Sequence, residues 1–335
     1  MSPTDTTGRY SRLPDDEAIA AGLRPSAPPS LAPGLGLTLY HGGAGIQPAV
    51  DAARELLAAV RPGIVCLHTT PDPTDGAVIA GVRALLPGVR VWVSPPANPL
   101  AGMPPAKARD AAERWASLCS AWDVEALILN VEGPSRPGLA GWTEGAPLKG
   151  AAHAAQVDAV LSGLRAGAGP RLRLGITSHD CPEWHRLRWD RWLGPDSPIV
   201  LHAPQVYAAP ARESDPPTPL RGAQGRYRMA HGQWARWIGR VRETLALGGA
   251  CCVPYVQGHG VSPEGTAWLL DQAADVLVWA APSRLDAHGA LALRVAAEVR
   301  RREGPGPGAV ARAQRSLGLT PDGIAGPITR AALGL

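Results

Sequence analysis

The segment LILNVEG (residues 127–133) ends an apolar run on a single carboxylate, and Gly, Pro and Ser dominate residues 133–138 directly after it. Successive side chains of an extended strand point to opposite faces. One face of the segment then carries Leu127, Leu129 and Val131. The other face carries Ile128, Asn130 and Glu132. We therefore expect a buried strand whose inner face ends on an acid.

Seven further segments have the composition of strands, and helix-like segments lie between them. The predicted strands are 35–41, 63–70, 90–96, 125–133, 171–180, 198–207, 250–260 and 275–282. Apolar residues recur at helical spacing in 47–60, 107–119, 151–164, 231–247, 263–274 and 286–303. Nearly continuous apolar strands that alternate with helices predict a parallel sheet covered by helices. Eight such units allow a closed (β/α)8 barrel.

A doubly wound open sheet is the alternative fold. The segment HGGAGIQ (41–47) after the first strand contains glycines, but it lacks the GxGxxG spacing of a dinucleotide-binding loop. We therefore favour the α/β class with a (β/α)8 barrel and a short α-helical C-terminal appendage.

Length and composition fit one large domain with a small addition. The chain has 335 residues, of which 45% are hydrophobic and 19% are charged, and its formal net charge is +4. The Arg residues are dispersed, which gives little support for nucleic-acid binding. No apolar run reaches the roughly 18 residues that a membrane span needs. We expect no nucleic-acid partner and no membrane span.

Two Pro- and Gly-rich stretches divide the chain. Residues 1–32 are predicted to form an extended N-terminal arm, residues 33–303 the barrel, and residues 304–335 a linker with a short C-terminal segment. The N-terminus lacks the basic start and the apolar core of a secretory signal. We expect synthesis in the cytoplasm without classical export.

The C-terminal segment carries the most specific motif of the chain. It resembles the second half of the peptidoglycan-binding domain of cell-wall hydrolases. The matching residues are Gln314, Leu317, Gly318, Leu319, Asp322, Gly323, Gly326, Pro327, Thr329, Ala332 and Leu333. In this motif Asp322-Gly323 provides a turn with positive φ, and Pro327 starts the last helix. The resemblance implies a peptidoglycan partner, and the alternative is a structural cap with the same turn.

Active sites of (β/α)8 barrels lie at the C-terminal ends of the strands. Glu132 at the end of the fourth strand is therefore our candidate general acid toward a glycosidic oxygen. The other interpretations are a helix cap or an ion pair with Arg. The segment also resembles the fourth strand of chitinase-type glycoside hydrolases, Asp-Gly-x-Asp-x-Asp-x-Glu, and that of barrel lysozymes, Asp-x-Glu. Only the final Glu is retained, and Asn130 takes the place of an Asp.

Those mechanisms need a second group. Asp180, at the end of the fifth strand, is the best candidate for a second carboxylate, and Asn130 can hydrogen-bond a substrate amide. The sixth-strand end, Gln205 and Tyr207, resembles the chitinase position where a Tyr supports the acetamido group of the substrate. Trp279 on the eighth strand matches the sugar-stacking Trp of such barrels.

Further polar residues at strand ends are predicted to contact substrate. They are His41, His179, Gln257 and His259. The same imidazoles, with His68, are typical of a metal-dependent barrel hydrolase. The first strand has a single His where that class has His-x-His, so our preferred interpretation includes no metal and no other cofactor.

The sequence thus predicts a hydrolase that cleaves a glycosidic bond of peptidoglycan at an N-acetylated sugar. Such a protein would act at the bacterial cell wall, in the manner of an endolysin or as part of a phage or phage-tail-like particle that its N-terminal arm contacts. The first alternative is a catalytically inactive wall-binding or structural module of such a particle. The second is the metal-dependent barrel hydrolase.

Overall fold

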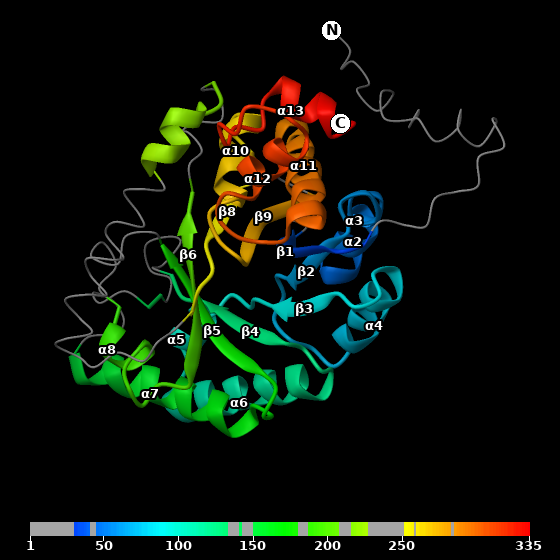
Figure 1. Ribbon diagram of the computed structural model, residues 1–335. Coiled ribbons are helices and arrows are strands. Elements are labelled where there is room, and N and C mark those ends of the chain that lie inside the picture. Colours follow the sequence, from blue (N-terminus) through cyan, green and yellow to red (C-terminus); the bar gives the residue numbers. More distant parts are fainter. Residues whose placement is uncertain are drawn as a thin grey trace, which may run out of the picture. The chain divides into compact units, whose positions relative to one another are not determined.

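A computed structural model describes most of the chain (Figure 1). The described residues are 30–40, 45–132, 141–142, 150–179, 187–207, 216–226, 251–257, 259–282 and 285–335. The fold presented here belongs to residues Leu31–Leu335, which form one compact unit.

One parallel sheet closes on itself as a barrel. Its strands are β1 (Ala32–Tyr40), β2 (Pro62–Leu67), β3 (Arg90–Val93), β4 (Ala126–Asn130), β5 (Arg173–His179), β6 (Ile199–Val206), β7 (Cys251–Cys252), β8 (Tyr255–Gln257) and β9 (Val276–Pro282). They follow the order β5-β4-β3-β2-β1-β9-β8-β6-β7, and β5 also pairs with β6. Because β7 and β8 are consecutive pieces that both pair with β6, the sheet has eight positions. The predicted (β/α)8 barrel is confirmed, and the open sheet is excluded.

Helices surround the sheet (Figure 1). They are α2 (Ile46–Ala52), α3 (Arg54–Val60), α4 (Asp75–Leu85), α5 (Asn98–Ala101), α6 (Pro105–Ala121), α7 (Gly150–Gly167), α8 (Trp189–Trp192), α10 (Pro263–Leu270), α11 (Ala287–Glu303), α12 (Ala309–Ser316) and α13 (Pro327–Ala332). A further helical segment spans 220–226. The helix predicted at 231–247 lies outside the described residues. None of the helices in the described part of the chain is long and apolar enough to cross a membrane.

Strand alternation sorts the apolar residues into two cores. Leu127, Leu129 and Val131 of the fourth strand belong to the core between the sheet and the helices. Ile128 belongs to the smaller core inside the barrel, where it joins Trp92 and other inward side chains. The predicted phase of this strand is therefore confirmed, and Asn130 and Glu132 lie above Ile128 on the inner face.

The C-terminal helices pack on the barrel instead of standing apart from it. Their apolar side chains share a core with α10 and α11, made of Ala267, Ala292, Val295, Val299, Ala309, Val310, Ala313, Ala325 and Leu333. The buried carboxylate of Asp271, just after α10, accepts hydrogen bonds from the backbone N–H of Gly308 (3.1 Å) and of Val310 (3.4 Å). The barrel helices thus supply four of these nine side chains, and Asp271 holds the start of α12.

Gln314 organises the turn between α12 and α13. Its side-chain nitrogen donates to Asp322 (2.7 Å), to the carbonyl of Ile324 (3.0 Å) and to Thr329 (2.9 Å). Its oxygen accepts from the N–H of Gly323 (2.8 Å). Gly323 has φ of 71°, and α13 begins at Pro327, as the motif predicts.

We predict that Gln314→Leu destabilises the protein by about 2 kcal/mol, because it removes the side-chain hydrogen bonds that hold the turn to the buried start of α13. Thermal unfolding monitored by circular dichroism measures this change. The neighbouring Arg315→Gln is the matched control, since Arg315 is exposed. Equal melting temperatures for the two variants would contradict the structural role of Gln314.

We also predict acid sensitivity from His202 on β6. Its imidazole is buried, lies 3.0 Å from the Ser178 hydroxyl, and has its pKa lowered from 6.5 to about 3 by burial. Below pH 6.5 the unfolded chain binds a proton at this residue and the folded chain does not, so stability falls as the pH is lowered. We expect a loss of about 2 kcal/mol between pH 7.5 and pH 5 from this group.

Urea unfolding at several pH values, with His202→Gln for comparison, isolates this contribution. The variant is expected to lose less stability than the wild type over the same pH range. Parallel pH profiles would contradict the assignment.

Candidate functional site

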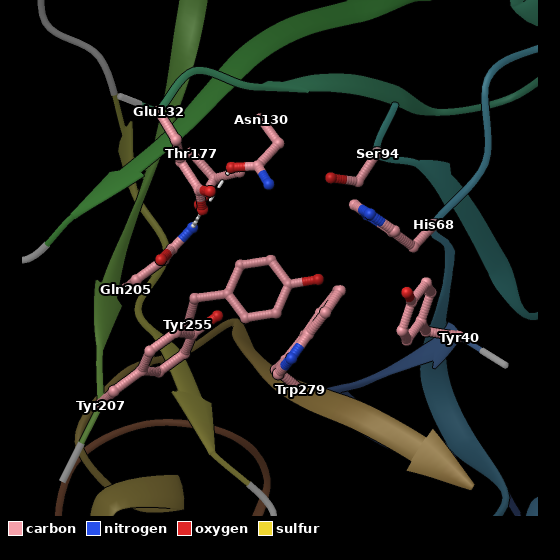
Figure 2. A pocket seen from close by; sticks show the side chains of 10 residues that line it. All are labelled: Tyr40, His68, Ser94, Asn130, Glu132, Thr177, Gln205, Tyr207, Tyr255 and Trp279. Carbon is pink, nitrogen blue, oxygen red and sulfur yellow. Dashed lines mark hydrogen bonds between the residues drawn. The ribbon is translucent and has the colours of Figure 1, made fainter. Parts of the chain in front are cut away.

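A cavity of about 230 Å³ opens at the C-terminal ends of the strands (Figure 2). Every position of the barrel contributes a side chain to it. The lining residues are Tyr40, His68, Ser94, Asn130, Glu132, Thr177, Gln205, Tyr207, Tyr255 and Trp279. The mouth of the barrel is therefore a polar pocket with several aromatic walls.

Hydrogen bonds to both the main chain and the side chain of Glu132 fix its position. The N–H of Val131 donates to the carbonyl of Thr177 (2.9 Å), which continues the pairing of β4 with β5 beyond Asn130. The carbonyl of Glu132 accepts from the N–H of Trp142 (2.8 Å). The side-chain nitrogen of Gln205 donates to Glu132 Oε1 (2.5 Å) and lies 3.2 Å from Asn130 Oδ1.

This arrangement orients both groups that the sequence singles out on β4. Because the side-chain oxygen of Asn130 accepts a hydrogen bond from Gln205, the amide nitrogen of Asn130 faces the middle of the cavity (Figure 2). Gln205 itself is 6% exposed, so it is a fixed donor. The site therefore presents a positioned carboxylate beside a positioned amide N–H.

Aromatic rings form the opposite wall. Tyr40 stacks on Trp279 with centroids 5.4 Å apart, and His68 meets both rings edge-on, 5.4 Å from Tyr40 and 4.8 Å from Trp279. The ring centroids of Tyr255 and Trp279 are 6.0 Å apart. The Tyr255 hydroxyl forms a hydrogen bond of 2.5 Å with the Thr38 hydroxyl in the barrel interior. Such rings offer apolar faces to a ligand.

His68 is electrically neutral at neutral pH. Burial lowers the pKa of its imidazole from 6.5 to about 4, although the Glu132 carboxylate and the backbone of Ser94 act in the opposite direction. The imidazole of His68 therefore adds no positive charge to the described lining at neutral pH.

The structure brings five of the predicted site residues together. Asn130, Glu132, Gln205, Tyr207 and Trp279 all line the cavity. Gln257 and His259 do not belong to its lining, and their contact with substrate stays a prediction. His41 and Asp180 lie outside the described residues, as does the side chain of His179, although its backbone ends β5.

Sequence analysis missed four lining residues, namely Tyr40, Ser94, Thr177 and Tyr255, and considered His68 only as a metal ligand. Strand alignment could have identified one of them, since Thr177 is the register partner of Asn130 in β5.

Within the described residues, no three His, Cys, Asp or Glu side chains converge in a way that could hold a metal ion. The described cavity lining holds one imidazole and one carboxylate. The metal alternative also involves His41 and the side chain of His179, which lie outside the described residues, so it stays a prediction.

Comparisons with known proteins concern the fold. No protein-family model matches the chain, and no curated protein matches it. Similar solved structures include a chitinase from Rhizomucor miehei, with a TM-score of 0.48 and 11% identity over 78% of this chain and 99% of that one. A β-N-acetylhexosaminidase from Beutenbergia cavernae has a TM-score of 0.42 and 13% identity over 79% and 90% of the two chains.

A type I 3-dehydroquinate dehydratase from Clostridium difficile also has a TM-score of 0.42, with 10% identity over 82% of this chain and 94% of that one. Likeness at this level of identity concerns the barrel architecture alone. A function must therefore be inferred from the chain's own side chains.

Proposed function

We propose that the chain is a glycoside hydrolase that cleaves a glycan at an N-acetylated sugar. The observation that carries this proposal is the Glu132 carboxylate at the end of β4, oriented by Gln205 and placed opposite aromatic rings in a cavity at the barrel mouth. A carboxyl group in this place can donate a proton to the glycosidic oxygen as the bond breaks. The aromatic faces suit the C–H surface of a sugar ring.

A second group must attack the anomeric carbon or activate water. Mechanisms with two acids need carboxyl groups about 5 to 5.5 Å apart for retention or about 6.5 to 9.5 Å apart for inversion. Within the described lining, Glu132 is the one carboxylate. Asp180, outside the described residues, remains the candidate for a two-acid mechanism.

The acetamido group of the substrate can replace the second carboxylate. Its carbonyl oxygen forms a bond to the anomeric carbon while the glycosidic C–O bond breaks and the Glu132 proton passes to the leaving oxygen. Water then opens the cyclic intermediate, and Glu132 takes back a proton. In this proposal the amide nitrogen of Asn130 and the hydroxyl of Tyr207 hold the acetamido group.

The bacterial cell wall is the proposed source of the glycan. Support comes from the resemblance of residues 309–335 to half of a peptidoglycan-binding domain, in which the positive φ of Gly323 and the helix start at Pro327 are as expected. The packing of this segment on α10 and α11 equally suits a structural cap. A non-catalytic wall-binding or particle component remains the second candidate, favoured by the single carboxylate of the described lining.

We predict that Glu132→Gln lowers the release of reducing ends from purified peptidoglycan at least about 100-fold, because general acid catalysis contributes roughly 10²- to 10⁴-fold. Glu55→Gln on α3 is the control, since Glu55 is an exposed acid that does not line the cavity. Sedimentation with wall fragments reports binding separately. Full activity of the Glu132 variant, or release by neither protein, would contradict the proposal.

We also predict that removal of the N-acetyl groups abolishes cleavage. Mass spectrometry of digests compares an N-acetylated β-1,4-linked tetrasaccharide with its de-N-acetylated form. Loss of cleavage is expected because the free amine has no carbonyl oxygen to attack the anomeric carbon. Cleavage of both forms at similar rates would refute the assisting role of the acetamido group.

A further inference from the structure

A second hollow adjoins the Glu132 cavity. Its volume is about 450 Å³, and its lining residues are Tyr40, Gly45, Ile46, His68, Thr69, Thr70 and Pro96. Tyr40 and His68 belong to both linings. The two hollows therefore meet at these two side chains, at the ends of β1 and β2.

The volumes of the two hollows limit the size of the ligand that each can hold. Ligand pockets commonly have volumes of about 300 to 1,000 Å³. The Glu132 cavity, at about 230 Å³, lies below this range, whereas the two hollows together fall within it. The two hollows together therefore have room for a ligand of more than one ring that extends past Tyr40 and His68.

Two buried polar atoms that line the site have no hydrogen-bond partner among the described residues. They are the hydroxyl oxygen of Thr177, a residue that is 2% exposed, and Nδ1 of His68. Buried polar groups are nearly always hydrogen-bonded, so each indicates a ligand group or water at that position. Thr177 lies in the Glu132 cavity, and His68 lies where the two hollows meet.

The lining of the second hollow indicates which kind of ligand it suits. No Asp, Glu, Lys or Arg occurs among the described residues that line it. Its imidazole is neutral at neutral pH, because burial lowers the pKa of His68 to about 4. These features suit an uncharged group with hydroxyls better than a strongly anionic one.

We propose that the two hollows form one groove for at least two linked, uncharged sugar units, and that His68 is the specificity-determining residue at their junction. The reacting sugar lies beside Glu132, the next unit lies over the ends of β1 to β3, and His68 Nδ1 bonds a hydroxyl or amide N–H between them. This inference rests on the proposed function, since it assumes a glycan in the Glu132 cavity.

Titration calorimetry on a Glu132→Gln background tests the groove without turnover. The probes are N-acetylglucosamine and its β-1,4-linked dimer and tetramer. We expect the dimer to bind at least tenfold more tightly than the monomer. His68→Phe, which keeps a ring against Tyr40 and Trp279, should remove most of this gain, and His68→Asn, which restores a polar atom near Nδ1, should recover part of it.

Kinetics of the otherwise unaltered protein provide a second readout. His68→Phe should raise KM for the tetramer about tenfold and change kcat little, whereas a merely structural role would lower both the melting temperature and kcat. Equal affinities for monomer and dimer, absence of binding, or an unchanged gain in His68→Phe would overturn the inference. Hydrolysis by the wild type is scored separately, so a groove that binds sugars without cleaving them would refute the proposed function alone.

Discussion

The pairing of β5 with β6 closes the sheet, and the site depends on this closure. In an open sheet β5 would be an edge strand, and the side chains of β6 would lie far from those of β4. Closure places Asn130, its register partner Thr177, and Gln205 from the next strand around one opening. The donor of Gln205 can then reach Glu132 and orient it. Because side chains alternate along β4, Leu127 and Leu129 point outward and are buried between the sheet and the helices.

The C-terminal segment has the turn that its sequence motif predicts, but it packs against the barrel. Gln314, Asp322 and Gly323 form the turn that the motif predicts, yet the apolar side of α12 and α13 lies against α10 and α11 of the barrel. The barrel helices α10 and α11 thus complete the core of the two short helices.

Sequence patterns predicted the barrel because eight apolar strands and their alternation are local properties of the chain. They also predicted Asn130, Glu132, Gln205, Tyr207 and Trp279, which end strands on the inner face. Tyr40, Ser94 and Tyr255 were missed because many strands end on polar or aromatic residues. The sequence of a strand does not show how far its end lies from the end of another strand. The roles of His68 and Thr177 emerged only from burial and from their unpartnered atoms.

The anomeric configuration of the first product is the most direct test of the central claim, that Glu132 acts with the substrate's own acetamido group. Nuclear magnetic resonance can follow an N-acetylated β-1,4-linked tetrasaccharide during the first minutes of cleavage, before the product equilibrates. Two successive displacements at the anomeric carbon predict that the β product appears first. An α product that appears first would mean direct attack by water with a second acid, and it would contradict this account.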